Sequence, residues 1–461
     1  MDVKGYKHIH CLGIGGIGLS AVARIFKSRG YEVSGSDIKS SAMTQLLQAH
    51  GIRVFIGHDA GNLQDADLLV YSNAVSNENP EIAEAHRRGI PVISRAQALG
   101  AIMKDYPYSV AVSGTHGKTT TTSMISLVLD NAKKDPTILV GGILDQFGGN
   151  VRVGQSDYFV TEACEYMNSF LSLHPLIEII LNIDSDHLDF FSGIEDIAQS
   201  FRTFASYVPQ DGMVFAYDAN PFVRSISDHL TCNVITFGLD KNSDFNGRNI
   251  VFSENGRPSF DLYRKDDFLT HMQLSVPGEH NVLNCLAAAA CCLSLGVDLL
   301  TVKETLEKFT GTQRRFDIIG KTEGGVTVID DYAHHPTEIR ATLSAASKIP
   351  HKKLWCLFQP HTYTRTMALF NEFTDAFADA DELIFAEIYA AREKNIYQMS
   401  SSKLADAVRE KHPGKHVRFI ADFSEMVRFV KENASDGDIV ITMGAGDIYK
   451  AGEQYLEACR R

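Results

Sequence analysis

The segment at 114–120, Gly-Thr-His-Gly-Lys-Thr-Thr, has the residue types and spacing of a loop that binds phosphate. It follows an apolar run at 110–113 and precedes a predicted helix at 121–129, so backbone N–H groups at the helix start would surround the phosphates. Lys118 would reach the outer phosphates, and Thr119 would ligate Mg²⁺. The usual eight-residue loop begins with glycine, but position 112 is Val112 here. The segment therefore predicts a nucleoside-triphosphate site on a shortened loop.

A second glycine-rich segment, Gly-Ile-Gly-Gly-Ile-Gly at 13–18, fits the pattern G-x-G-x-x-G. It follows a predicted strand and opens a predicted helix, where glycines let the backbone approach a diphosphate. Asp37 ends the next predicted strand, where an acid that binds ribose is expected. Alone, this motif favours a dinucleotide cofactor and leaves a nicotinamide enzyme and a nucleotide-diphosphate binder equally open. The phosphate loop in the same chain disfavours a plain dehydrogenase.

Two segments with acidic and imidazole side chains come after the phosphate loop. Thr-Glu-Ala-Cys-Glu at 161–165 ends one predicted strand, and Asn-Ile-Asp-Ser-Asp-His-Leu-Asp at 182–189 ends the next. Strand ends are where a parallel α/β sheet collects its ligand site. We therefore expect Glu162 and His187 to converge on the phosphates through magnesium.

Strand and helix alternate along most of the chain, which predicts an α/β protein with parallel, doubly wound sheets. At roughly 150 residues per domain, the 461 residues predict about three domains. These are an N-terminal Rossmann-like domain at 1–107, a central P-loop domain at 108–313 with a parallel sheet plus a smaller β region, and a C-terminal Rossmann-like domain at 314–461. The order of elements within 211–275 is not predicted.

The elements expected from apolar periodicity fall into two sets. The predicted strands are 8–12, 31–34, 52–56, 67–71, 90–93, 110–113, 158–161, 178–182, 326–329, 354–358, 382–386, 417–420 and 439–443. The predicted helices are 17–29, 41–50, 79–88, 95–103, 121–129, 281–296, 336–348, 365–379, 401–411, 423–433 and 445–459.

The composition excludes several classes of function. The chain has 44 Lys and Arg against 57 Asp and Glu, and the net charge of −13 argues against broad binding to nucleic acid or anionic membranes. Eight cysteines without a C-x-x-C pair predict reduced thiols rather than disulfides or a zinc site. The most apolar stretch, 285–297, is shorter than the ~20 residues that span a bilayer, and the N-terminus lacks the pattern of a signal peptide. We expect a cytoplasmic protein without membrane insertion, as a monomer or homodimer.

Taken together, these motifs resemble those of the Mur ligases. The resemblance rests on the phosphate loop, on 162–165 and 182–187, and on Asp-Asp-Tyr-Ala-His-His-Pro at 330–336, and it runs from about Lys7 to Ile448. The glycine motif with Ser-Gly-Ser-Asp at 34–37 is most similar to that of the members that join L-alanine to UDP-N-acetylmuramate. The resemblance implies an N-terminal domain for the UDP-sugar, a central ATPase and a mobile C-terminal domain for the amino acid.

The resemblance also implies roles for particular residues. The implied catalytic residues are Lys118, Glu162, His187, His334 and Arg365. The implied ATP contacts are Gly114, Thr115, His116, Gly117, Lys118, Thr119, Thr120, His280, Asn281, Arg315 (or its neighbour Arg314) and Asp331. The implied UDP-sugar contacts are Gly13, Gly15, Gly16, Ile17, Gly18 and Asp37, and those of the amino acid are Tyr332, His334 and Arg365. The implied magnesium ligands are Thr119, Glu162 and His187.

The sequence departs from the family pattern at two places. Thr362 stands where some relatives carry arginine, so Arg365 alone is left in this segment to hold the amino-acid carboxylate. Several sister ligases place a carbamylated lysine after the Asp-His motif to ligate a second metal, and 196–202 contains no lysine. The sequence therefore does not show how a second magnesium would be completed.

The function that the resemblance implies is ATP-dependent ligation of L-alanine to the lactyl carboxylate of UDP-N-acetylmuramate, in peptidoglycan precursor synthesis. Hydroxide is a very poor leaving group at neutral pH, so the carboxylate must first become an acyl phosphate that an amine can attack. Three alternatives stay open: a tripeptide-recycling ligase of the same superfamily, a nicotinamide-dependent oxidoreductase and a P-loop binding switch. Phosphate release that requires two further substrates would separate the ligase from the switch.

Overall fold

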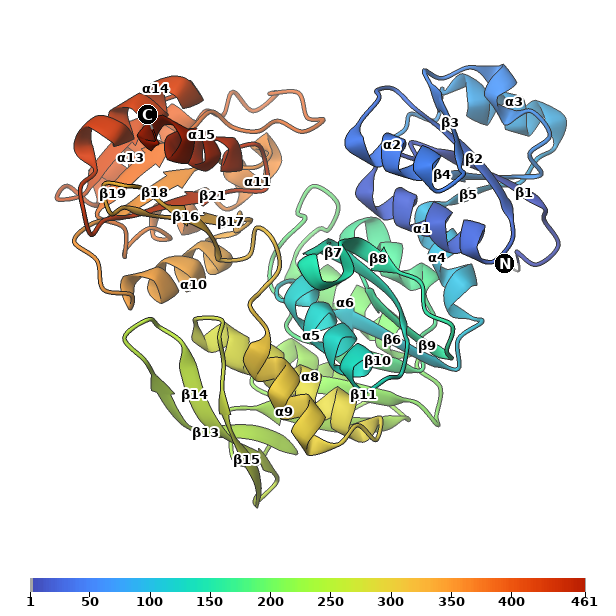
Figure 1. Ribbon diagram of the computed structural model, residues 1–461, viewed down its shortest axis with the longest axis horizontal. Helices are drawn as coiled ribbons and strands as arrows, with labels where there is room; N and C mark the ends of the chain where they lie inside the picture. Colours follow the sequence, from blue (N-terminus) through green and yellow to red (C-terminus); the bar gives the residue numbers. More distant parts are fainter. Residues whose placement is uncertain (1–2, 461) are drawn as a thin grey trace.

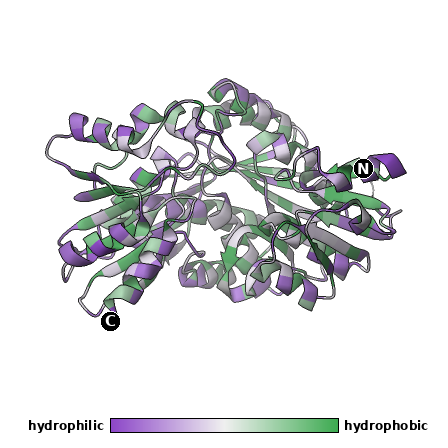
Figure 2. Cartoon of the chain, turned by 90° about the horizontal axis from the view of Figure 1, so that it is seen from above, coloured by the Kyte–Doolittle hydropathy of each residue, from purple (hydrophilic) through white to green (hydrophobic). Residues whose placement is uncertain are grey.

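The computed structural model describes residues 3–460, which form three lobes, each built on its own β-sheet (Figure 1). The N-terminal lobe (blue) and the C-terminal lobe (orange to red) both lie against the central lobe. Apolar strands lie inside each lobe, and hydrophilic residues concentrate on the outer helices (Figure 2). The predicted α/β class with three domains is confirmed. Among the described residues, no helix is both long and apolar enough to cross a bilayer.

The N-terminal sheet is parallel throughout and has the strand order β3-β2-β1-β4-β5. In this doubly wound order, ligands bind at the carboxyl ends of the strands near β1, so the glycine loop at 13–18 lies at the expected position. The strands are β1 (His8–Leu12), β2 (Glu32–Asp37), β3 (Arg53–Ile56), β4 (Leu68–Tyr71) and β5 (Val92–Ser94). The helices are α1 (Ile17–Ser28), α2 (Ala42–Ala49), η1 (Ala60–Leu63), α3 (Pro80–Arg88) and α4 (Arg95–Met103).

The central sheet has ten strands in the order β15-β14-β13-β12-β11-β10-β6-β9-β7-β8. Its strands are β6 (Tyr108–Ser113), β7 (Thr137–Leu144), β8 (Gly149–Arg152), β9 (Tyr158–Glu162), β10 (Ile177–Ile180), β11 (Met213–Tyr217), β12 (Asn233–Gly238), β13 (Phe245–Phe252), β14 (Pro258–Arg264) and β15 (Asp267–Gln273). Its helices are α5 (Lys118–Asn131), η2 (Asp145–Phe147), η3 (Tyr166–Ser172), α6 (Ile194–Ala205), α7 (Pro221–Ser227), α8 (Glu279–Ser294) and α9 (Leu299–Lys308).

The smaller β region predicted for the central lobe is the antiparallel set β13–β15, and it belongs to the same sheet as the parallel strands. Phe237 and Gly238 at the end of β12 pair in parallel with Phe245 and Asn246 of β13, which joins the antiparallel strands β13–β15 to the parallel strands. Backbone hydrogen bonds thus run continuously from β15 to the phosphate-loop strand β6.

The C-terminal sheet has the order β16-β17-β21-β18-β19-β20, and only the edge pair β16–β17 is antiparallel. Its strands are β16 (Asp317–Lys321), β17 (Thr327–Asp331), β18 (Leu354–Phe358), β19 (Glu382–Phe385), β20 (His416–Phe419) and β21 (Ile439–Met443). Its helices are α10 (Pro336–Ser347), α11 (Tyr363–Ala368), α12 (Phe370–Thr374), α13 (Ser401–Lys411), α14 (Phe423–Asn433) and α15 (Tyr449–Cys459).

Three predicted helices differ from the structure by three or more residues at one end. The helix predicted at 365–379 is two short helices, because Leu369 leaves the helical region (φ −108°, ψ 26°) and α12 ends at Thr374. The helix predicted at 445–459 begins only at Tyr449, after the glycine turn at 444–446. The helix predicted at 121–129 begins earlier, at Lys118, because Gly117 in the left-handed region ends the loop there.

The N-terminal and central lobes share one apolar core. A single buried cluster contains Leu99 and Ile102 of α4 together with Phe170 and Leu173 of the central lobe. The backbones of the two lobes are also in close contact here, since a Cβ atom added to Gly100 would lie 1.9 Å from the carbonyl oxygen of Ser172. These two lobes therefore meet as parts of one packed body.

We expect Gly100→Ala to destabilise the protein, because neither backbone can move away without opening the shared core. Overpacking of this kind costs about 1–3 kcal/mol, so the melting temperature should fall by several degrees. Differential scanning calorimetry would measure it. Gly414→Ala is the matched control, because a Cβ atom there meets nothing within 4 Å. Equal melting temperatures for the two variants would contradict this close backbone contact.

Candidate active site

The phosphate loop leads into the first turn of α5, and two of its glycines have positive φ. Gly114 and Gly117 have φ of +138° and +87°, and a Cβ atom on Gly117 would lie 2.6 Å from Oδ1 of Asn284. No side chain caps the first turn of α5, so the N–H groups of this turn face the loop without a side-chain acceptor. Such N–H groups and the helix dipole favour a bound phosphate.

The segment after β10 fixes the phosphate loop from the other side. Asn182 accepts a hydrogen bond from the His116 N–H through Oδ1 (2.8 Å) and donates through Nδ2 to the His116 carbonyl (3.0 Å). The Asp184 N–H donates to Oγ1 of Thr115 (2.9 Å). The loop is therefore attached to the second motif predicted from the sequence.

Lys118 points back into the loop and forms a buried ion pair. Its Nζ donates to the carbonyls of Gly114 (2.5 Å) and Thr115 (3.0 Å), and it lies 2.9 Å from Oε2 of Glu165. The Glu165 side chain is only 3% exposed. Burial alone would lower the pKa of Lys118, but Glu165 outweighs this effect and raises it. Lys118 is therefore a fixed positive charge at the loop.

Thr119 and Glu162 flank the backbone of β7 at Gly141 and Gly142. The Gly141 N–H donates to Oε1 of Glu162 (2.5 Å), and a Cβ atom on Gly142 would lie 3.1 Å from Cγ2 of Thr119. His187 has a positive φ of +54°, and its ring contacts Tyr166 at 4.6 Å between centroids. Its Nε2 lies 3.8 Å from Oε1 of Glu165. Glu165 thus stands between Lys118 and His187.

A cavity of about 410 Å³ lies between the central and C-terminal lobes. Its lining includes many of the predicted ATP contacts, which are His116, Gly117, Thr120, His280, Asn281, Arg315 and Asp331. Arg315 faces this cavity, whereas Arg314 turns away to bind Asp330 (3.0 Å) and the Gly444 carbonyl (2.8 Å) within its own lobe. Of the two arginines, the geometry therefore favours Arg315 as the nucleotide contact.

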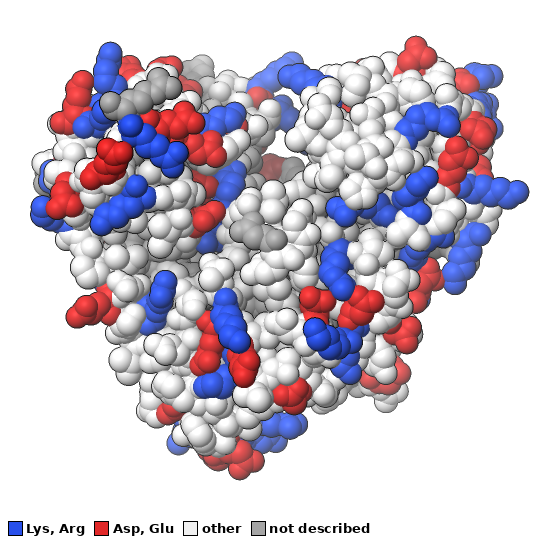
Figure 3. Space-filling view, in the orientation of Figure 1, with Lys and Arg blue, Asp and Glu red and all other residues white. Residues whose placement is uncertain are grey.

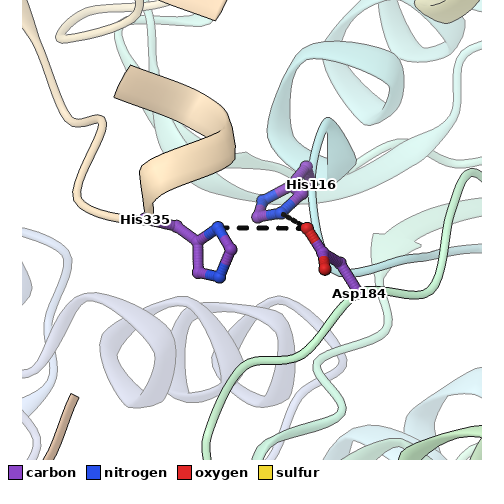
Figure 4. Close-up of side chains that lie close together, drawn as sticks. All are labelled: His116, Asp184 and His335. Carbon is purple, nitrogen blue, oxygen red and sulfur yellow. Dashed lines mark hydrogen bonds and ion pairs between the residues drawn. The ribbon is translucent and has the colours of Figure 1, made fainter. Parts of the chain in front are cut away.

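Histidines and carboxylates of the two lobes meet beside this cavity, and three of them, His116, Asp184 and His335, are drawn in Figure 4. His116 lies 3.3 Å from Asp184 and, through Nδ1, 3.2 Å from Glu338 of α10. Oγ1 of Thr337 donates to Asp184 (2.9 Å), and Nε2 of His335 donates to the Ser185 carbonyl (2.9 Å).

His116, Asp184 and His335 are close enough to resemble a metal site, but hydrogen bonds account for their spacing. Nδ1 of His335 accepts the Thr337 N–H (3.2 Å), and both ring nitrogens of His116 face carboxylates. Burial alone would lower the pKa of His116, but Asp184 and Glu338 outweigh it and raise the pKa to about 9. The cluster is therefore a charged link between the lobes.

The three predicted amino-acid contacts lie in one region of the C-terminal lobe. The rings of Tyr332 and His334 are 5.4 Å apart, and His334 lies 5.8 Å from His361. Burial lowers the pKa of His334 to about 3, so its ring is neutral. Arg365 donates through Nη1 to Nδ1 of His361 (3.0 Å) and pairs with Asp186 of the central lobe (2.9 Å). Thr362 caps α11 by accepting the Arg365 N–H, so it has a structural role at the position where some relatives carry arginine.

The N-terminal glycine loop (13–18) is far in sequence from the predicted amino-acid contacts, but it contacts the central lobe. Gly13 (φ +82°) donates its N–H to the Ser36 carbonyl (2.8 Å), and no side chain caps α1. Asn150 of β8 donates to the Ile17 carbonyl (2.9 Å). The Asp37 carboxylate accepts the Gly15 N–H (2.8 Å), so it braces the loop itself.

Several polar residues of the site were not predicted from the sequence. They are Glu165, Asp184, Asp186, Thr337 and Glu338, and their partners lie far away in the chain or in another lobe. One local signal was present for Glu338, because it stands three residues after His335 in the spacing of a capping box. For the others no sequence spacing could reveal the partner.

Comparison with known proteins shows similarity along nearly the whole chain. Three family models match: "Mur ligase family, catalytic domain" at 8–107, "Mur ligase middle domain" at 112–292, and "Mur ligase, glutamate ligase domain" at 314–446. The chain is 49% identical to a UDP-N-acetylmuramate--L-alanine ligase of Caldanaerobacter subterraneus (99% of each chain) and 50% identical to one of Clostridium novyi (98% of each).

Solved structures give the same result. The fold matches a crystal structure of UDP-N-acetylmuramate-alanine ligase MurC from Thermotoga maritima with a TM-score of 0.82, at 32% identity over 99% of both chains. A murein peptide ligase from Psychrobacter arcticus matches with a TM-score of 0.73, at 26% identity over 98% of both chains.

We expect Lys118→Ala to destabilise the nucleotide-free protein as well as to reduce turnover. The change leaves Glu165 buried without its cation, which costs about 3–5 kcal/mol, and turnover should fall at least about 100-fold. The double variant Lys118→Ala/Glu165→Gln removes the unpaired charge, so it should regain most of the melting temperature but no turnover. Calorimetry and phosphate release would measure both. A double variant as unstable as Lys118→Ala would show that the ion pair is not the cause.

The raised pKa of His116 predicts a pH-dependent contribution to stability. The ring binds a proton in the folded protein up to about pH 9, against about 6.5 when unfolded, so its contribution is complete below pH 6.5 and disappears as the pH rises to about 9. Asp184 and Glu338 face the ring, and His335 lies 4.8 Å away. The melting temperature of His116→Asn should therefore be below that of the wild type at pH 6.5, and the gap should shrink by pH 9. A gap independent of pH would contradict a protonated His116.

Proposed function

Because the chain belongs to the Mur ligase family, whose members are ATP-dependent ligases, we propose that it joins L-alanine to the lactyl carboxylate of UDP-N-acetylmuramate. The products are UDP-N-acetylmuramoyl-L-alanine, ADP and phosphate, in peptidoglycan precursor synthesis. Relatives that carry the name of this reaction are about half identical over nearly their full length. The observation that carries the proposal is that one short segment connects two parts of the site. Asp184 contacts His116 of the phosphate loop, and Asp186, two residues further on, pairs with Arg365 in the predicted amino-acid region.

The chemistry requires a carboxylate to be activated and then kept from water. Transfer of the γ-phosphoryl group forms an acyl phosphate, and attack by the neutral amine of alanine expels phosphate. Lys118 is placed to offset charge on the phosphates, and the N–H groups of α5 would contact them. Contact between the two lobes around the cavity would exclude water from the intermediate.

The site also fits a divalent cation. The Thr119 hydroxyl and the Glu162 carboxylate offer the oxygen donors that Mg²⁺ prefers, beside the loop that would hold the β- and γ-phosphates. We assign these two residues to one magnesium, and Glu162 with His187 to a second. A bound Mg²⁺ would neutralise phosphate charge during transfer.

The remaining roles follow from position. The glycine loop, with uncapped α1, would bind the diphosphate of the UDP-sugar, and Asp37 would keep that loop in shape. His280, Asn281, Arg315 and Asp331 would surround the nucleoside of ATP. We place the functional boundaries between the lobes near 107 and 313. Since ATP and UDP-sugars are cytoplasmic metabolites, we propose a cytoplasmic location.

The test is phosphate release by the wild-type protein with ATP, Mg²⁺ and UDP-N-acetylmuramate. We expect release only when the UDP-sugar and an amino acid are both present, with L-alanine ahead of glycine and L-serine. Mass spectrometry of the UDP product would identify the bond formed.

Other outcomes would overturn the assignment. A preference for the tripeptide L-alanyl-γ-D-glutamyl-meso-diaminopimelate would identify a recycling ligase. Phosphate release with ATP alone would indicate a nucleotide switch, and reduction of a nicotinamide cofactor would indicate an oxidoreductase.

A further inference from the structure

Arg365 and Asp186 form a buried ion pair across the boundary between the central and C-terminal lobes. Nε of Arg365 donates to Oδ1 of Asp186 (2.9 Å), and Nη2 donates to Oδ2 (3.3 Å). The two side chains are only 10% and 8% exposed. Two parallel hydrogen bonds fix the plane of the guanidinium group, which a single contact would not do.

The remaining edge of the guanidinium is only partly used. Nη1 donates to Nδ1 of His361 (3.0 Å), and among residues 3–460 no other acceptor is found for Arg365. A guanidinium group has five N–H hydrogens, so one on Nη1 and one on Nη2 are left for another acceptor. A carboxylate is the group that such a pair of hydrogens binds best.

Asp186 also stands beside the predicted metal ligand. Its Oδ1 accepts the His187 N–H (2.7 Å), and its Oδ2 lies 3.7 Å from Nε2 of His187. Asp186 is therefore a carboxylate anchored by its own backbone neighbour, with Arg365 as its main cation.

We propose that Asp186 is a positioning residue of the amino-acid site, which holds Arg365 so that its two remaining N–H groups bind the carboxylate of the incoming amino acid. The inference rests on the proposed function, which gives Arg365 an amino-acid carboxylate to bind. Because Asp186 and Arg365 belong to different lobes, the carboxylate site is complete only while the lobes are in contact.

The test is the variant Asp186→Asn, which keeps the size of the side chain but removes its charge. Its amide N–H₂ would face a guanidinium N–H, so Arg365 would lose its fixed orientation. We expect the KM for L-alanine to rise about 10- to 100-fold, with a smaller change in kcat. The KM values for ATP and UDP-N-acetylmuramate, and the magnesium requirement, should change less than about threefold.

A double-mutant cycle separates positioning from a merely structural role. Arg365→Lys keeps the charge but cannot form the two parallel hydrogen bonds, so it should raise the KM for L-alanine by itself. If Asp186 acts through Arg365, then adding Asp186→Asn to Arg365→Lys should raise that KM by less than about threefold more. Independent, multiplicative effects would overturn the proposal. If Asp186→Asn alone folds poorly, the single variant Arg365→Lys still tests the two parallel hydrogen bonds, because it leaves the Asp186 carboxylate paired with a cation. An unchanged KM for L-alanine in Arg365→Lys would then overturn the proposal.

Lys348→Met is the matched control, since it removes another contact between the same lobes, that of the Lys348 Nζ with the ring of Phe252 (3.8 Å), outside the cavity. It should leave the KM for L-alanine within about threefold of the wild type. A general weakening of lobe contact would instead raise the KM for L-alanine equally in Lys348→Met and Asp186→Asn, and this would overturn the proposal. So would a raised magnesium requirement in Asp186→Asn with an unchanged KM for L-alanine, because Asp186 would then serve His187.

The wild-type measurements keep the two claims apart. If the wild type does not couple phosphate release to L-alanine and the UDP-sugar, the proposed function fails. If the wild type does so and Asp186→Asn has an unchanged or lower KM for L-alanine, only the inference about Asp186 fails.

Discussion

The short segment from Asn182 to Asp186 is the constraint on which the arrangement of the site depends. It follows a buried parallel strand, so its polar groups are brought to the edge of the sheet where they must find partners. On one side Asn182 and Asp184 hold the phosphate loop, and on the other Asp184, the Ser185 carbonyl and Asp186 bind the C-terminal lobe. A buried charge without a partner is costly, so the lobes and the loop satisfy each other's carboxylates. Loop geometry and lobe position are thereby linked through five consecutive residues.

The two boundaries between lobes differ in their chemistry. The N-terminal lobe shares an apolar core with the central lobe, and its helix α4 approaches η3 to backbone contact at Gly100. The C-terminal lobe has its own apolar clusters, against one of which Leu188 of the central lobe packs, and it meets the central lobe mainly through histidines, carboxylates and Arg365. Polar side chains can exchange protein partners for water, whereas an apolar core cannot be opened without exposing hydrophobic surface. A space-filling view shows the hollow that remains between the two outer lobes (Figure 3).

The fold was largely predictable from the sequence because most elements carry a strong local signal. Helix α4 and strands β18 and β21 have the predicted bounds, since their apolar residues are continuous or periodic and Ser94 caps α4. The order of strands β13–β15 was not predicted, because only β14 keeps a regular alternation of buried and partly exposed residues, and both of its pairings contain a bulge. In the site, the loop and strand-end motifs were visible, but the pairs Lys118–Glu165, His116–Glu338 and Asp186–Arg365 were not. The last two join residues far apart in the chain, and only tertiary structure brings them together.

The shared core of the first two lobes has a consequence for inhibitor chemistry. The glycine loop on α1 and the phosphate loop on α5 belong to one packed body, so the distance between them is set by the core and does not depend on the C-terminal lobe. A compound that joins a diphosphate mimic to a nucleotide mimic can therefore use a stiff linker and avoid the entropy lost on ordering a flexible one. A compound extended toward Arg365 would instead need a flexible linker, because Arg365 belongs to the lobe that is held by polar contacts, which water can replace.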